Sequence, residues 1–112
     1  MKKYIELEAN AAATHLKIEV YYHLGGYNCF TAKSENRGYY LSISPVTRSN
    51  RDGFTFESYT AFSGIKQCVK TVARKSATAE REAEEKAARI EKMLIEWVCD
   101  KNGLPLPLEV QA

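Results

Sequence analysis

The sequence is poor in the residues that metal sites and disulfide-stapled folds require. Its 112 residues include three cysteines and two histidines, and no pair of cysteines has the C-x-x-C spacing. Cys29, Cys68 and Cys99 are widely spaced in apolar surroundings, so we expect three buried free thiols in a reducing compartment. We expect no metal site and no cofactor.

Long hydrophobic runs are also lacking. No apolar stretch approaches the roughly 20 residues that a membrane-spanning helix needs. The first residues, MKKYIELEA, carry acidic side chains where a signal peptide needs an unbroken apolar core. These absences predict a cytoplasmic protein without a membrane partner.

Charge of a single sign does not dominate the chain, whose net charge is +2, but the charge is unevenly divided. Residues 1–75 hold eleven Lys or Arg and six Asp or Glu, a net charge of +5, whereas residues 76–112 hold five and eight, a net charge of −3. Such a chain can meet an anion at one end without being strongly basic. The length fits a single domain over residues 1–112, and the composition, 45% hydrophobic and 27% charged, is globular.

Alternating patterns predict strands over the first two thirds of the chain. Residues 16–24, LKIEVYYHL, alternate apolar and polar side chains as a half-buried strand does. Gly25-Gly26 then predicts a tight hairpin in which Tyr21 faces Phe30 on the outer side of the sheet. The N-terminal KKYIELEA is expected to form an edge strand.

Residues 37–49, RGYYLSISPVTRS, predict a further strand that contains two adjacent tyrosines. Because side chains of a strand alternate between its faces, Tyr39 should point into the core and Tyr40 should stand in solvent on the opposite face. Pro45 lacks a backbone donor, so we expect it at the end of the strand or at an edge position.

Residues 65–74, IKQCVKTVAR, fit two patterns. The spacing of their apolar residues suits a helix, whereas their β-branched content and the preceding Ser-Gly favour a strand in a hairpin with residues 54–62. We favour the strand, which would place Glu57 opposite Lys70. This hairpin would gather five apolar residues on the core side: Phe54, Phe56, Phe62, Ile65 and Val69.

Residues 76–103 predict one long helix. Ser76 or Thr78 is the candidate N-cap, and Gly103 is typical of the residue that ends a helix. Residues 104–112 are expected to form an extended tail on the surface. The apolar stripe of the helix is Ala83, Ala87, Ile90, Leu94, Trp97 and Val98.

The predicted fold is therefore α+β, an antiparallel meander sheet of four to six strands with the long C-terminal helix packed on one face. A helix with one apolar stripe covers only one side of the sheet, so the other side stays open. Lys66, Lys70 and Arg74 are spaced by four residues, which keeps them on one side in a strand or in a helix. The candidate site residues on the open side are Tyr21, Phe30, Tyr40 and Tyr59, with Lys66, Lys70, Arg74, Arg37 and Arg48.

Aromatic rings among Lys and Arg on an open sheet are typical of single-stranded nucleic-acid binding. Bases stack on the rings and the cations contact phosphates. An exposed aromatic face is equally typical of a homodimer or of an interface with a partner protein. The second interpretation includes an inhibitor of a host defence factor and a protein that sequesters a signalling nucleotide.

Residues for catalysis are not arranged in a recognisable pattern. His15 and His23 lie eight residues apart around one predicted strand, so they cannot converge on one group, and no paired carboxylates occur outside the helix. We therefore predict a non-enzymatic binding protein, a homodimer, that binds nucleic acid through its open sheet face. The alternative is a protein-interaction or inhibitor protein that uses the same face.

Three stretches, RGYYLSISPV, SYTAFSG and ARKSATAEREA, carry a resemblance that covers approximately residues 17–100. In them the chain resembles small uncharacterised proteins of clostridial and other Firmicutes genomes and mobile elements, which have no assigned activity. The resemblance implies an accessory protein of a phage or conjugative element. Such proteins often bind DNA or inhibit a host defence factor.

Overall fold

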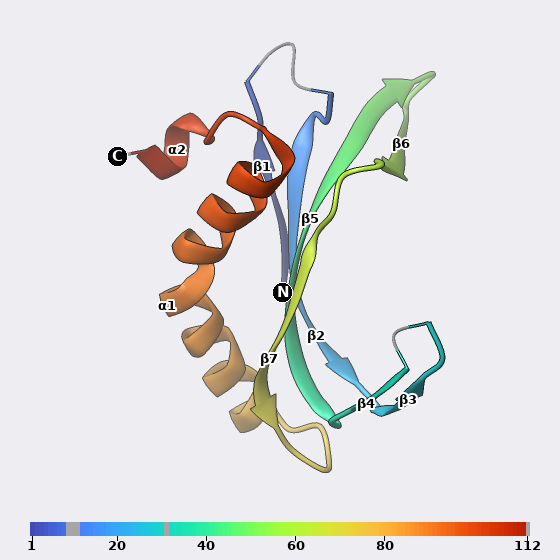
Figure 1. The fold of residues 1–112 in the computed structure, drawn as a ribbon, viewed down its shortest axis with the longest axis vertical. Helices are drawn as coiled ribbons and strands as arrows, with labels where there is room; N and C mark the ends of the chain where they lie inside the picture. The colour runs from blue at the N-terminus through green and yellow to red at the C-terminus, as the bar shows by residue number, and fades with distance from the viewer. Residues whose placement is uncertain (9–11, 31, 112) are drawn as a thin grey trace.

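The structure is a computed structural model that describes residues 1–8, 12–30 and 32–111 (Figure 1). Seven strands precede one long helix and one short helix in the described part of the chain. Their bounds are β1 Lys2–Glu6, β2 His15–His23, β3 Gly26–Asn28, β4 Lys33–Glu35, β5 Gly38–Arg51, β6 Phe54–Tyr59, β7 Ile65–Thr71, α1 Ala77–Asn102 and α2 Leu108–Gln111.

Strand β5 is the centre of the main, antiparallel sheet. Its residues 38–46 pair with β2 along one edge. The other edge is shared, because β7 pairs with residues 38–43 and β6 with residues 46–51. β1 adds to the far side of β2, and β3 and β4 form a separate two-stranded sheet. The predicted α+β class, the antiparallel sheet and the N-terminal edge strand are thus confirmed.

Pro45 lies within β5 and not at its end, but its nitrogen faces an unpaired stretch of one edge, which agrees with the other position predicted. The Thr14 amide donates to the Val46 carbonyl, so the backbone groups of even-numbered residues in this part of β5 face β2. Those of odd-numbered residues, including the nitrogen of Pro45, face the opposite edge. There β7 reaches only to Ile43 and β6 only to Val46. Neither strand needs a donor from Pro45, and β5 continues through it.

The Gly25-Gly26 turn does not join the two strands that we predicted. All nine residues of β2 pair with β5 instead. The two glycines, with φ of 77° and 112°, turn the chain into the small β3–β4 hairpin, a conformation that favours glycine. Tyr21 consequently faces Tyr40 and not Phe30.

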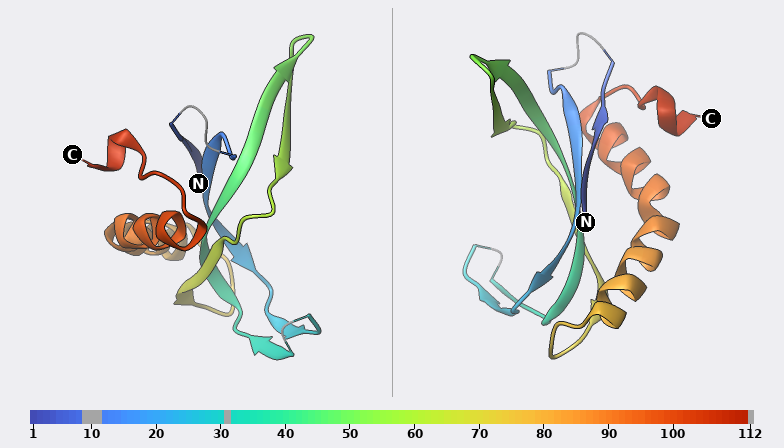
Figure 2. Two further views of the ribbon diagram at one scale, coloured as in Figure 1. Left: turned by 45° about the horizontal axis from the view of Figure 1, so that its top comes forward. Right: turned by 180° about the vertical axis from the view of Figure 1, so that it is seen from behind.

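The ambiguous segment contains a strand, β7, as favoured, but this strand does not pair with β6. Both lie on the same edge of β5, so Glu57 is opposite Arg48 and not opposite Lys70. The β5–β6 hairpin projects away from α1 (Figure 2), which leaves Phe54 and Phe56 exposed, contrary to the prediction. Three predicted core residues do contact the core: Phe62, Ile65 and Val69.

Helix α1 has the predicted caps, and its buried face is rotated toward Ile95. Five residues of the predicted stripe contact the core, as expected: Ala83, Ala87, Ile90, Leu94 and Val98. Ser76 accepts a hydrogen bond from the Ala79 amide at 3.0 Å, and Gly103 has a φ of 65°. Ile95 is 1% exposed, whereas Trp97 is 44% exposed and does not anchor the core as predicted. The helix packs on β2, β5 and β7, and Glu91 on the helix forms an ion pair with Lys3 on β1. In this orientation Ile95 lies in the core.

The segment after α1 and the cysteines also differ from the prediction in part. Residues 108–111 form the short helix α2, so the tail is not extended throughout. Cys99 is buried, and burial raises the pKa of its thiol. Cys68 is half-buried and Cys29 is exposed in the turn after β3, outside the core. In the part of the chain that is described, no helix is long and apolar enough to cross a membrane.

The core lies between α1 and one face of the main sheet. Figure 2 shows both ends of the sheet leaning to the side away from α1, so the opposite face is concave. The β5–β6 hairpin bounds this face at one end and the β3–β4 hairpin at the other. Residues of β2 and β5 that were predicted to face inward form much of the core: Leu16, Ile18, Val20, Tyr39, Leu41 and Ile43.

The rotation of α1 can be tested with two truncations of large side chains. Ile95→Ala should lower the free energy of unfolding by about 2–4 kcal/mol, because it leaves a cavity in the core. Trp97→Ala should cost about 1 kcal/mol or less, because the ring is partly exposed and contacts Lys101. Urea unfolding followed by circular dichroism measures both; an equal or larger loss for Trp97→Ala would contradict the register described above.

Candidate nucleic-acid interface

The concave face of the sheet carries most of the side chains that sequence predicted there. The register of β2, β5, β6 and β7 brings them together in two clusters, one near the β3–β4 hairpin and one near the β5–β6 hairpin. We call this surface the open face. Its aromatic and charged residues are Tyr4, Lys17, Glu19, Tyr21, His23, Tyr40, Arg48, Glu57, Tyr59 and Lys66, and Glu35 lies against it from β4.

The first cluster is built on the pairing of β2 with β5. The rings of Tyr21 and Tyr40 stack with centroids 6.3 Å apart, and the His23 ring lies edge-on to Tyr40 at 5.4 Å. The Lys66 ammonium lies 5.1 Å from the centre of the Tyr40 ring and 2.6 Å from a Glu35 carboxylate oxygen. The hydrogen bond from Lys66 lowers the pKa of Glu35, and burial raises the pKa of Tyr21.

Tyr40 lies on the open face, as predicted, but it is only 6% exposed and does not stand in solvent. Its hydroxyl donates a hydrogen bond to the Asn36 carbonyl at 2.7 Å, and burial raises its pKa. Neighbouring side chains cover the ring on this side of the sheet. Tyr40 is therefore a support on which Tyr21 stacks, rather than a ring that is free to stack on a ligand.

The second cluster joins the edge strand β1 to β2, β5 and β6. The Tyr4 hydroxyl donates to one Glu57 carboxylate oxygen at 2.5 Å, and the Lys17 ammonium donates to the other at 3.0 Å and to the Tyr59 hydroxyl at 3.3 Å. The Arg48 guanidinium carbon lies 3.8 Å from the centre of the Tyr4 ring, a cation–π contact. Tyr59 remains 69% exposed.

These contacts shift the pKa of Tyr4, Lys17 and Glu57. The hydrogen bonds from Tyr4 and then Lys17 lower the pKa of Glu57, against the opposing effect of desolvation. The hydrogen bond to Glu57 raises the pKa of both Tyr4 and Lys17. The carboxylate therefore stays ionised over a wider pH range and holds the two donors in place.

Lys70 does not lie on the open face, contrary to the prediction. The pairing of β5 with β7 shifts by one residue, so that Tyr40 is opposite Cys68 whereas Tyr39 is opposite Lys70. Such a bulge breaks the alternation of side chains along a strand. The Lys70 ammonium lies 2.6 Å from a carboxylate oxygen of Glu82 on α1, and this hydrogen bond lowers the pKa of Glu82.

Three further predicted site residues lie at the margins of the molecule. Phe30 is 95% exposed in the turn between β3 and β4, away from Tyr21. The Arg37 side chain precedes β5 and donates to the Leu24 carbonyl at 2.9 Å. Arg74 is exposed in the segment between β7 and α1. The structure thus brings together Tyr21, Tyr40 and Lys66 in one cluster and Tyr59 and Arg48 in the other.

Six members of the open face were not among the predicted site residues: Tyr4, Lys17, Glu19, His23, Glu35 and Glu57. The alternation of residues 16–24 places Lys17 on the same side as Tyr21, so this position could have been found. Alternation also places Glu57 on the same side as Tyr59. The pairing of Glu35 and Glu57 with lysines could not be found, because these lysines are 31 and 40 residues away in the chain.

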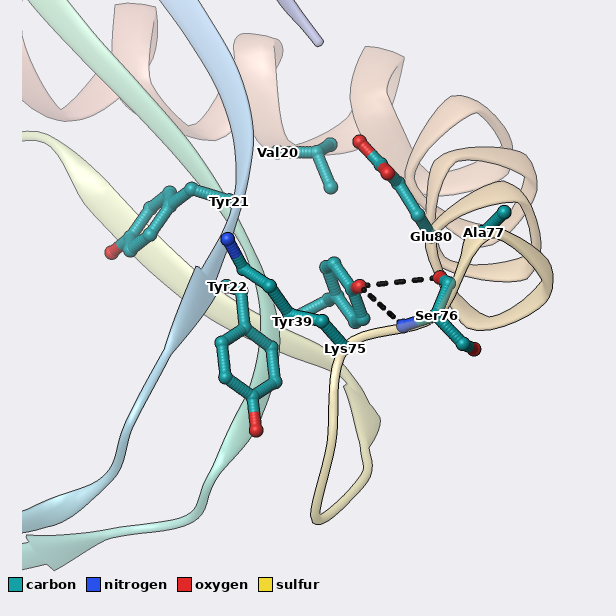
Figure 3. A pocket seen from close by; sticks show the side chains of 8 residues that line it. All are labelled: Val20, Tyr21, Tyr22, Tyr39, Lys75, Ser76, Ala77 and Glu80. Carbon is teal, nitrogen blue, oxygen red and sulfur yellow. Dashed lines mark hydrogen bonds between the residues drawn. The ribbon is translucent and has the colours of Figure 1, made fainter.

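A cavity of about 490 Å³ lies beside the start of α1 (Figure 3). The Tyr39 hydroxyl is 3.4 Å from both the amide nitrogen and the carbonyl oxygen of Ser76, and the Tyr22 hydroxyl donates to the Ala73 carbonyl at 3.0 Å. The hydroxyl groups of Tyr39 and Tyr22 are therefore engaged within the protein. The lining residues are Val20, Tyr21, Tyr22, Tyr39, Lys75, Ser76, Ala77 and Glu80.

A scan against protein-family models and searches of curated proteins and of solved structures found no match for this chain. Within residues 1–8, 12–30 and 32–111, no three His, Cys, Asp or Glu side chains gather in a way that could hold a metal ion.

The Glu57 cluster predicts a pH-dependent contribution to stability. Because folding lowers the pKa of Glu57, its contribution is present above the unfolded pKa of about 4.3 and is lost as the pH falls through the lower folded value. Glu57→Gln should cost about 1 kcal/mol at neutral pH, and the difference from wild type should vanish near pH 3. Urea unfolding at both pH values measures this, with Asp52→Asn in the exposed β5–β6 turn as the control. A difference that persists unchanged in acid would contradict the role of the carboxylate.

Proposed function

We propose that this protein is a non-enzymatic binding protein whose open face holds single-stranded nucleic acid. The observation that carries the proposal is the repetition, along one concave face, of a cluster that combines tyrosine rings with a lysine. Eight residues of β5 separate Tyr40 from Arg48, which at about 3.3 Å per residue is roughly 26 Å. A face of that length accommodates several nucleotides.

The rings suit the stacking of bases. Tyr59 is largely exposed, and Tyr21 is half-buried with its ring backed by Tyr40. A ring that is held by a second ring loses little rotational freedom when a base stacks on it, which reduces the entropic cost of binding. Unpaired bases present their π-faces to such rings, whereas bases within a duplex are already stacked, and this favours single strands.

The cations of the open face are already paired with carboxylates in the free protein. Lys66 is bonded to Glu35 and Lys17 to Glu57. A phosphate must therefore compete with an internal carboxylate for each ammonium group, which predicts modest affinity and a salt dependence limited to these few contacts. The two glutamates also limit the attraction of anions in general, so stacking contributes to selection of a strand.

The proposal is tested by fluorescence anisotropy with a labelled single strand of about 15 nucleotides. The three cations Lys17, Lys66 and Arg48 should give a slope of log K against log salt of about −2. Tyr21→Ala and Tyr59→Ala should each weaken binding by about 1–3 kcal/mol. Glu35→Gln should strengthen binding, because it releases Lys66 for a phosphate.

Trp97→Ala provides the matched control, since this exposed aromatic ring lies on α1, across the sheet from the open face. It should leave the affinity unchanged. An absence of binding at low salt, or equal losses for Tyr59→Ala and Trp97→Ala, would reject the proposal. Binding that Glu35→Gln weakens would reject the assignment of Lys66 as a phosphate contact.

A second candidate function is a protein interface, which one observation favours. Phe54 and Phe56 are 69% and 54% exposed on the face of the β5–β6 hairpin opposite Arg48. A projecting two-stranded hairpin is only marginally stable by itself, and covering two phenylalanines would stabilise it. The partner in this case is a second copy of the chain or a target protein such as a defence factor.

Sedimentation velocity over a range of protein concentrations tests the homodimer. A dimer held by the hairpin should dissociate more readily in the double variant Phe54→Ser, Phe56→Ser, and should respond weakly to salt because its contacts are apolar. Substitution of the exposed Leu108 by Ser is the control. A monomer at every concentration would exclude the homodimer, and a dimer that the double variant does not affect would exclude the hairpin as its interface.

A further inference from the structure

A small polar pocket of about 200 Å³ lies along the β5–β6 hairpin, at one end of the open face. It is lined by His15 from β2, by Arg48, Ser49 and Asn50 from β5, and by Thr55 from β6. Pockets for whole small molecules start at about 300 Å³, so this one suits a single charged group rather than a nucleotide.

Arg48 brings a positive charge to this pocket that no carboxylate balances directly. Within the described residues its guanidinium makes no ion pair, and its Nε atom is buried without a hydrogen-bond partner. Glu57, the residue opposite it on β6, is occupied by Tyr4 and Lys17. Arg48 is half-buried, and its charge acts on Glu57 without an ion pair between them. Its guanidinium therefore retains donors that an anion can use.

The position of Arg48 is fixed by its surroundings. Its amide donates to the Thr14 hydroxyl at 2.8 Å, and its guanidinium lies over the Tyr4 ring. A guanidinium held in this way has lost much of its rotamer freedom before a ligand arrives, which favours binding of an anion with several oxygen atoms.

The remaining lining residues supply further hydrogen-bond donors. Asn50 accepts a hydrogen bond from the Thr55 hydroxyl through its side-chain oxygen at 2.7 Å, which leaves its NH₂ group as a donor. His15 contacts the Thr14 hydroxyl through Nδ1 at 2.8 Å, which leaves Nε2 on the other side of the ring. Arg48 and Asn50 thus provide donors from two directions for one anion. Because the Thr14 hydroxyl donates to the Val46 carbonyl and accepts from His15 Nδ1, His15 adds a third donor, Nε2, only when its ring is protonated.

We propose that this pocket binds a phosphomonoester and, in the complex with nucleic acid, the terminal phosphate of the bound strand. Binding of the nucleic-acid strand is taken from the proposed function, on which this inference rests. Binding of the phosphate is inferred from the pocket itself. A terminal phosphate carries a charge of about −1.5 to −2 at neutral pH and three acceptor oxygens, more than a phosphodiester within the chain. It therefore matches a small pocket with one fixed guanidinium at the end of a path of stacking rings.

The test compares strands of one sequence that end in a 5′-phosphate, a 3′-phosphate or hydroxyl groups only, by anisotropy with the full chain. A strand with the preferred phosphate should bind about tenfold more tightly than the hydroxyl strand. Arg48→Gln should abolish this gain. Arg51→Gln, an exposed arginine near the tip of the same hairpin, should preserve it. A titration with inorganic phosphate, followed by the NMR amide signals of residues 48–50, reports on the pocket without a strand.

The outcomes separate this inference from the proposed function. Binding of strands with no gain from either terminal phosphate overturns the inference and leaves the proposed function intact. Binding of inorganic phosphate that requires Arg48, without binding of any strand, supports the phosphate pocket and overturns the proposed function. No binding of either overturns both. If Arg48→Gln does not fold, as circular dichroism would reveal, the exposed Asn50→Ala decides: an unchanged phosphate gain in this variant overturns the pocket.

Discussion

The division of one edge of β5 between two strands is the constraint on which the rest of this structure depends. β7 occupies the first part of that edge and β6 the second, while β2 pairs along the opposite edge. The strand therefore belongs both to the sheet that α1 covers and to the projecting hairpin. Pro45 lies where the edge passes from one partner to the other, the place where a missing amide proton costs no ladder hydrogen bond.

The same strand supplies both faces of the molecule. Leu41 and Ile43 belong to the core under α1, while Tyr40 and Arg48 belong to the two clusters on the open face. Each cluster joins a tyrosine ring to a lysine that is bonded to a glutamate. This arrangement keeps the lysines ordered and partly neutralised in the absence of a ligand. A bound anion therefore replaces a glutamate as the partner of each lysine.

Much of the candidate site could be predicted because alternation along a strand is a local property. It correctly put Tyr21 and Tyr40 on the side away from the helix, although the partner predicted for Tyr21 was wrong. The prediction for Lys70 was wrong because the pairing of β5 with β7 contains a bulge, an irregularity that the sequence pattern does not reveal. Burial of Tyr40 could not be foreseen either, since the groups that contact it come from β2, from β7 and from the segment before β5.

The sequence by itself determined the α+β class, the extent and caps of α1, the edge strand β1 and the inward and outward faces of β2. These features depend on contacts between residues that are near in the chain, namely side-chain periodicity and capping. Only the tertiary structure decided which strands pair, how α1 is rotated and which glutamate neutralises which lysine. Pairings of this kind depend on competition among several strands for the edges of β5, and on a curvature of the whole sheet to which many residues contribute together.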